Sequence, residues 1–94
     1  MFVVIFRAKI KKYDEVYSAT AEKLRQLAID EYGCREFVSF AEGDDEVAIS
    51  WWDSLEQIAN WKNNPEHLAA QAKGRSIWYD SVSVEVLQTL RKYK

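Results

Sequence analysis

Residues 2–10, with the sequence FVVIFRAKI, begin with five consecutive apolar side chains. In an extended chain, alternate side chains point to opposite faces, and here both alternating sets are apolar over the first half of the stretch. A strand with this pattern is covered on both faces. Any fold for this chain must therefore place other elements, or another molecule, against each side of its first strand.

Residues 13–32 have the spacing of an amphipathic helix. Asp14 stands where an N-cap is expected, and Gly33 follows the last turn, where a left-handed residue ends many helices. The side chains that recur at helical spacing, and that we expect to face the sheet, are Val16, Thr20, Leu24, Leu27 and Ala28.

Residues 34–42 and 46–53 form the next predicted unit, a hairpin whose turn lies at residues 43–45. Its second strand ends in two adjacent tryptophans, Trp51 and Trp52, which must project from opposite faces of a sheet. This second strand is therefore apolar on both faces, like the first strand of the chain.

Two further helices and a strand are predicted in the second half of the chain. The sequence Asn-Asn-Pro at residues 63–65 ends one helix and begins another, with Asn64 as the N-cap and proline at the first helical position. The short helix that follows is expected to run through Gln71 and to stop near Gly74. A last strand is predicted over residues 81–93.

The resulting order, β-α-β-β-α-β, is that of a ferredoxin-like α+β domain, which has an antiparallel sheet with its helices on one face. We expect residues 1–94 to form one such domain. Because two of its strands are apolar on both faces, the face without helices also needs cover. The prediction is a homodimer in which two copies of the chain pack sheet face against sheet face.

Composition narrows the range of functions. The chain is 48% hydrophobic and 14% aromatic, which is more than the thin core of a 94-residue domain needs, so part of this surface is expected in an interface or a ligand cavity. The net charge of −2 and the scattered basic residues argue against a nucleic-acid partner. The apolar start is too short for a signal peptide or membrane span, and the single Cys34 suits a reducing compartment, so we expect a cytoplasmic protein without a membrane partner.

A set of motifs in the second half of the chain resembles one known family. The motifs are Trp51-Trp52-Asp53-Ser54, then Trp61, then Asn64-Pro65-Glu66-His67, followed by Ala70-Gln71 and Gly74-Arg75. Together with the order of the elements, they make the chain resemble the antibiotic biosynthesis monooxygenase family of dimeric α+β barrels. The resemblance extends through the whole chain.

This resemblance implies an activity and a site. Characterised relatives oxidise polycyclic aromatic or quinol-like substrates with O₂, without metal or flavin, in a pocket between the sheet and the helices. We therefore expect O₂ as a co-substrate and no bound cofactor. The family's functional tryptophan falls on Trp61, and a polar ring residue, Tyr or His in relatives, falls on or near His67. A sister group degrades haem with an Asn on the first strand; its counterpart in this pocket is Phe6, which argues against haem.

His67 is the residue on which the catalytic interpretation depends. It lies near the positive end of its predicted helix, which disfavours the imidazolium form, so a neutral ring able to accept a proton is expected. Deprotonation of a phenol or anthrone gives an electron-rich anion that can pass an electron to O₂. The alternative is a surface or capping histidine, because no triad partner is recognisable in the sequence.

The other candidate site residues have two interpretations each. Trp61 and Trp52 would form pocket walls, with the Trp61 indole N–H donated to a substrate oxygen, or both would only pack a helix against the sheet. Gln71, one turn after His67, would orient the imidazole or lie in solvent. Arg75 would stabilise a developing oxyanion, or it would be a helix C-terminal cation or the partner of an ion pair.

Other chemistries find no support in the sequence. One histidine and one distant cysteine make no zinc pattern, and the acidic residues around the hairpin turn, Glu46 among them, lack the spacing of a calcium loop and are expected to be solvated. Three functions stay open: a cofactor-independent monooxygenase acting on a small aromatic, a non-catalytic dimeric binding or stress-response domain, and a haem-degrading enzyme. A cavity reaching His67 would favour the first over a domain whose interior is filled by tryptophans.

Overall fold

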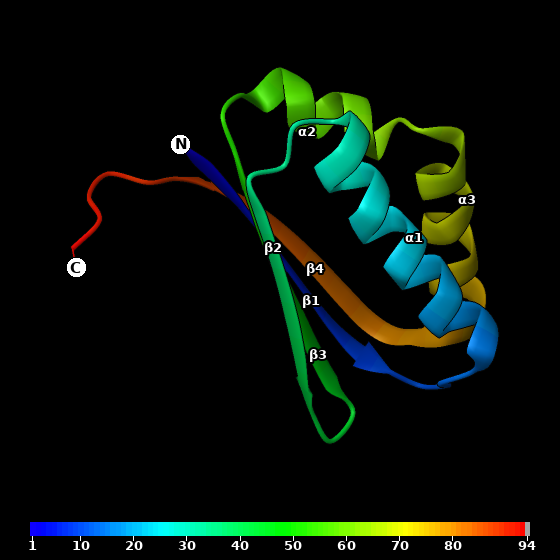
Figure 1. Cartoon of the computed structure of the whole chain (residues 1–94). Helices are drawn as coiled ribbons and strands as arrows, with labels where there is room; N and C mark the ends of the chain where they lie inside the picture. The colour runs from blue at the N-terminus through cyan, green and yellow to red at the C-terminus, as the bar shows by residue number, and fades with distance from the viewer. Residues whose placement is uncertain (94) are drawn as a thin grey trace.

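The computed structural model describes residues 1–93 and shows a four-stranded antiparallel sheet with every helix on one face (Figure 1). The predicted ferredoxin-like α+β fold is confirmed. In chain order the elements are β1 (Phe2–Ile10), α1 (Glu15–Glu31), β2 (Glu36–Glu42), β3 (Asp45–Trp52), α2 (Leu55–Lys62), α3 (Pro65–Lys73), the π-helical turn η1 (Gly74–Trp78) and β4 (Tyr79–Gln88).

The strand order is β2-β3-β1-β4, so β1 lies inside the sheet and pairs with β3 on one side and β4 on the other. Phe6 stands opposite Ala48 on β3 and Val84 on β4. These three side chains belong to the face that carries the helices, because residues directly opposite each other in a sheet share a face. The interior position of β1 explains why its sequence is apolar on both sides.

The predicted ends of α1 are confirmed, and so is its inward face except at Val16. The Asp14 carboxylate accepts a hydrogen bond from the Tyr17 backbone N–H at 2.7 Å, and Gly33 has a φ of 83°. Val16, which was predicted to face the sheet, is 50% exposed, whereas Tyr17 is 5% exposed and packs with the core. Because successive helical residues lie about 100° apart, Tyr17 and Ala28, eleven positions on, fall on the same stripe.

The predicted end of α3 near Gly74 is confirmed, but the π-helical turn that follows it was not predicted. Gly74 has helical angles, φ −58° and ψ −48°, and the chain continues through η1 to Trp78. A Cβ atom at Gly74 would overlap the ring of Tyr79, so glycine is needed for this close approach and not for a left-handed turn. As a result β4 begins at Tyr79, two residues earlier than predicted, and it ends at Gln88 rather than at residue 93.

The apolar core forms two clusters beneath the helices. One is built around Trp52 and Trp61, and the other around Tyr17 and Trp78. Trp52 is completely buried, and its indole N–H donates a hydrogen bond to the Ser50 hydroxyl at 2.8 Å. The two indoles at the end of β3 do project from opposite faces, since only Trp52 lies on the helix side.

The opposite face of the sheet is apolar as well, and no helix covers it (Figure 1). By the alternation of each strand, this face, which we name the outer face, carries Val3, Ile5, Val38, Phe40, Val47, Ile49, Trp51 and Leu87. Several of these side chains are substantially exposed, Phe40 at 58% among them. The outer face is therefore apolar over β2, β3 and the first half of β1, and it reaches β4 at Leu87, beside the polar Glu85 and Ser83.

Candidate functional site

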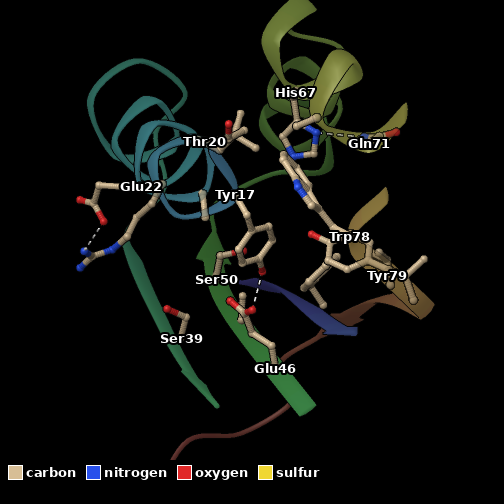
Figure 2. Close-up of a pocket in the computed structure, with 18 of the residues that line it drawn as sticks. Tyr17, Thr20, Glu22, Ser39, Glu46, Ser50, His67, Gln71, Trp78 and Tyr79 are labelled. Carbon is tan, nitrogen blue, oxygen red and sulfur yellow. Dashed lines mark hydrogen bonds and ion pairs between the residues drawn. The ribbon is translucent and has the colours of Figure 1, made fainter. Parts of the chain in front are cut away.

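A cavity of about 530 Å³ lies between α1, α3 and the helix-facing side of the sheet (Figure 2). All four strands contribute to its lining, and so do side chains from both core clusters. Its volume falls in the range of roughly 300–1,000 Å³ that is typical of small-molecule sites. The cavity occupies the position at which the family resemblance implied a pocket. Its principal aromatic wall residues are Phe6, Tyr17, Phe37, Trp61, Trp78 and Tyr79.

His67 lies in the wall of this cavity because of how α3 begins. The Asn64 side-chain oxygen accepts hydrogen bonds from the backbone N–H groups of Glu66, at 2.8 Å, and His67, at 3.4 Å, and Pro65 occupies the first helical position. This predicted N-cap is confirmed, and it fixes the rotation of the first turn. The imidazole then packs edge-on against Trp61, with the ring centroids 4.3 Å apart and the planes at 79°.

The surroundings of His67 favour the neutral form of its imidazole by lowering its pKa. Burial is the main cause that lowers its pKa below the ordinary histidine value, and the positive charge of Lys62 lowers it further. A hydrogen bond involving the His67 backbone opposes these effects without cancelling them. Neutrality was expected from the helix end, but desolvation by the surrounding aromatic side chains is the larger contribution.

Gln71 lies one helical turn after His67, and the two side chains are in contact. The Gln71 amide nitrogen is 2.9 Å from Nδ1 of His67 (Figure 2). An amide nitrogen only donates, so in this arrangement Nδ1 accepts and the ring proton lies on Nε2. If the amide turns by half a rotation, its carbonyl accepts from Nδ1–H and Nε2 becomes the acceptor. Gln71 therefore selects the tautomer of His67.

Trp61 and Trp52 have structural roles that the sequence left open. The Trp61 indole N–H donates a hydrogen bond to the Leu24 backbone carbonyl at 3.1 Å, so this group is occupied within the protein, which favours the packing interpretation of the N–H. The Trp61 ring still lines the cavity. Trp52 packs behind it, with the centroids 5.2 Å apart, and is not among the lining residues. Trp52 supports the wall that Trp61 forms.

Phe6 and Arg75 both line the cavity, as the sequence suggested. Phe6 extends from β1, and its ring meets Tyr79 edge-on at 5.6 Å. Arg75 extends from η1 and is exposed, and within residues 1–93 no salt bridge involving it is seen. The structure thus brings His67, Gln71 and these two residues to one cavity.

A second polar group in the cavity was not predicted. The Tyr17 hydroxyl donates a hydrogen bond to Oε2 of Glu46, and the Tyr79 ring stands perpendicular to the Tyr17 ring with the centroids 6.0 Å apart. Burial, together with the hydrogen bond to Glu46, raises the pKa of Tyr17 well above its ordinary value. Figure 2 shows this group on the side of the cavity away from His67.

One signal in the sequence could have identified Glu46. It precedes Ala48 and Ser50 in the alternation that ends at Trp52, so it shares their face and points toward the helices. The run of acidic residues at the hairpin turn led instead to the interpretation of a solvated turn. Tyr17 could have been found from helical spacing, because it lies three, seven and eleven positions before Thr20, Leu24 and Ala28 on the predicted inward stripe.

Within residues 1–93, no group of three or more His, Cys, Asp or Glu side chains is arranged to hold a metal ion. None of the helices in this part of the chain has the length and apolar character needed to cross a membrane.

Comparison with known proteins agrees with this fold. The family model for antibiotic biosynthesis monooxygenase matches residues 1–73. The uncharacterized protein YqjZ of Bacillus subtilis (strain 168) is 38% identical over 92 residues, which is 97% of this chain and 81% of that protein. The structure of Rv0793 from Mycobacterium tuberculosis matches with a TM-score of 0.83 at 20% identity, covering 99% of this chain and 98% of the other. SnoaB, a cofactor-independent oxygenase from Streptomyces nogalater, matches with a TM-score of 0.79 at 11% identity, covering 97% and 94%.

Proposed function

The chain belongs to the antibiotic biosynthesis monooxygenase family, and from this premise we propose that it is a cofactor-independent monooxygenase that oxidises a small aromatic, quinol- or anthrone-like compound with O₂. The observation that carries the proposal is a cavity of about 530 Å³ in which His67, kept neutral by burial, faces aromatic walls. A cavity of this size accommodates a fused aromatic ring system. A neighbour in structure, SnoaB, is a cofactor-independent oxygenase, which supports the same class of reaction.

The proposed reaction needs an electron-rich anion of the substrate. Loss of a proton from a phenol or anthrone gives such an anion, which passes one electron to O₂, and recombination of the two radicals forms a carbon–oxygen bond. For an anthrone, the CH₂ group becomes C=O and the second oxygen atom leaves as water. The substrate thus supplies all the electrons, and the protein needs to hold the substrate, handle its proton and exclude water.

His67 is the group that we assign to the substrate oxygen, and Gln71 decides how it acts. With the Gln71 amide nitrogen on Nδ1, the Nε2–H of His67 is a hydrogen-bond donor that stabilises a developing oxyanion. With the amide carbonyl on Nδ1, Nε2 is a neutral base that accepts the proton. Arg75, at the exposed rim, adds a positive charge that favours either anion.

We also propose that the working unit is a homodimer joined through the outer face. This face is apolar over β2, β3 and the first half of β1, and it has no helix over it. Soluble chains rarely leave a continuous apolar surface of this kind in water. A second copy provides a complementary surface, because a two-fold axis pairs one patch with itself.

The test of the oxygenase function is the rate of O₂ consumption with anthrone, measured in an oxygen electrode and corrected for spontaneous oxidation. We expect the wild-type chain to accelerate consumption and His67→Ala to reduce the enzymatic rate by about 100-fold or more, the usual contribution of a proton-handling group. Leu68→Ala is the matched control, because Leu68 is the next residue of α3, is 47% exposed and does not line the cavity.

If the proposal is correct, His67→Ala slows O₂ consumption and Leu68→Ala does not. Equal rates in wild type and His67→Ala would remove His67 from the mechanism. Binding of anthrone without any O₂ consumption would instead support the non-catalytic binding domain. Haem degradation is tested separately by titrating haemin; Phe6, where haem-degrading relatives have Asn, places an apolar ring in the cavity, so we expect no turnover of haem.

A further inference from the structure

The side of the cavity opposite His67 contains a carboxylate that the proposed mechanism does not use. Glu46 extends from the helix-facing side of β3 and lines the cavity. It is held there by Tyr17, whose hydroxyl donates a hydrogen bond to Oε2 from α1. Tyr79, at the start of β4, packs perpendicular to Tyr17 and completes a group that joins two strands and a helix.

This group leaves one strong hydrogen-bond acceptor without a protein partner. Burial and the bond to Glu46 keep the Tyr17 phenol protonated, so its hydrogen stays committed to Oε2. Among residues 1–93, Tyr17 is the one side chain that hydrogen-bonds to Glu46, which leaves Oε1 free. A carboxylate oxygen of a half-buried residue that lines a cavity and has no protein donor is a favourable partner for a ligand O–H group.

A second orphan group lies in the same walls. Trp78 is 2% exposed, and its indole Nε1–H has no hydrogen-bond acceptor within the described residues. The Trp78 ring packs edge-on against Tyr17, with the centroids 5.1 Å apart, and it lines the cavity (Figure 2). The Trp78 N–H therefore suits an acceptor oxygen of a ligand, whereas the free Glu46 oxygen suits a ligand O–H donor.

We propose that Glu46, held by Tyr17, is a specificity-determining residue that binds a phenolic hydroxyl of the ligand, at the end of the cavity away from His67. This inference rests on the proposed function only in taking the cavity as the ligand site. It adds a requirement on the ligand: an aromatic framework with a hydroxyl donor at one end and an oxygen for His67 at the other. Methylation of that hydroxyl removes the hydrogen and must weaken binding.

The test is a pair of probes that differ in that hydrogen alone, 6-hydroxytetralone and 6-methoxytetralone, titrated by calorimetry in the absence of turnover. We expect the wild-type chain to bind the hydroxyl probe at least about ten-fold more tightly, which is typical of a hydrogen bond to a charged group. Glu46→Gln is expected to bring this preference down to about two-fold while changing the affinity for the methoxy probe little. Glu42→Gln, an exposed change on the same hairpin, is the matched control and should leave the preference intact.

A second variant keeps the proposal testable if Glu46→Gln does not fold. Tyr17→Phe retains the ring that packs on Trp78 and removes the hydroxyl that orients Glu46, so the preference should fall several-fold. Equal affinity of the wild type for both probes, binding of neither, or an unchanged preference in both variants would overturn the proposal. A preference for the hydroxyl probe in a chain that consumes no O₂ would support the Glu46 subsite and reject the oxygenase function. Failure of one proposal can therefore be told apart from failure of the other.

Discussion

The contact between His67 and Gln71 decides what the cavity can do at the level of single residues. Burial lowers the pKa of His67, so the unfolded chain takes up a proton more readily than the folded one. The contribution of His67 to the free energy of unfolding is therefore fully present at pH values above the ordinary histidine pKa of about 6.5. As the pH falls through that value, this contribution to the free energy of unfolding is lost, and the loss is complete below the pKa of the folded state.

Replacing the Gln71 amide by a carboxylate should raise the pKa of His67, which burial lowers in the wild type. In Gln71→Glu, the new carboxylate accepts a hydrogen bond from Nδ1–H and stabilises the imidazolium, so we expect the pKa of His67 to rise by about one unit or more. The ring is the only imidazole in the chain, so its NMR signals can be followed through a pH titration without assignment. Gln71→Met, which removes the contact but keeps the burial, should leave the pKa low; a rise in both variants would contradict the role given to Gln71.

Residue positions that depend on spacing along one element could be predicted from the sequence, and those that depend on packing could not. The contact of Gln71 with His67 follows from their separation of four positions in a helix. The inward direction of Tyr17 follows likewise from its helical spacing with Thr20, Leu24 and Ala28, whereas the use of the Trp61 N–H by the Leu24 carbonyl follows from the distance and angle at which α1 is seated. The packing of neighbouring elements sets this distance and angle, and the periodicity of the sequence does not predict them.

The start of α3 is the element boundary on which the site depends. Asn64 caps α3 with its side-chain oxygen, and its amide nitrogen donates to the Tyr32 hydroxyl, at the end of α1, at 3.0 Å. One side chain thus orients α3 and ties it to α1, the two helices that border the cavity. The position of His67 three residues later is a consequence of this arrangement.

Removal of this cap should destabilise the protein measurably. Asn64→Ala loses the capping bonds and the bond to Tyr32, so we expect the free energy of unfolding to fall by about 1–3 kcal/mol. Asn63→Ala is the matched control, because within the described residues the Asn63 side chain makes no hydrogen bond. Urea unfolding followed by tryptophan fluorescence gives both values. Equal losses in the two variants would show that the cap of α3 is not what holds this region.

Element ends were predictable where the signal is local. The caps at Asp14, Ser54 and Asn64 appear in the structure because each involves side chains within three residues of the helix start. The passage from α3 through η1 into β4 was predicted incorrectly, because it depends on the ring of Tyr79 lying against Gly74. A sequence pattern that places glycine after a helix does not distinguish a left-handed end from a close approach.

At the scale of the whole molecule, the outer face is the feature that needs explanation. The register places Ile49 at its centre, opposite Ile5 on β1 and Val38 on β2. These side chains are only partly buried in the single chain. A dimer through this face would bury them on the side of the sheet away from the cavity, so assembly and ligand binding would use separate surfaces of the same strands.

A charge at the centre of the outer face should therefore dissociate the dimer without closing the cavity. In Ile49→Glu, a carboxylate would be buried without a partner in each subunit, a cost of several kcal/mol per ion that the interface cannot offset. We expect wild type to sediment as a dimer and Ile49→Glu as a folded monomer in analytical ultracentrifugation. Ile77→Glu, a matched change on the helix side at a residue that is 38% exposed, should remain dimeric. A wild-type monomer, or an Ile49→Glu dimer, would mean that the outer face is not the interface and that the apolar first strand has some other cover.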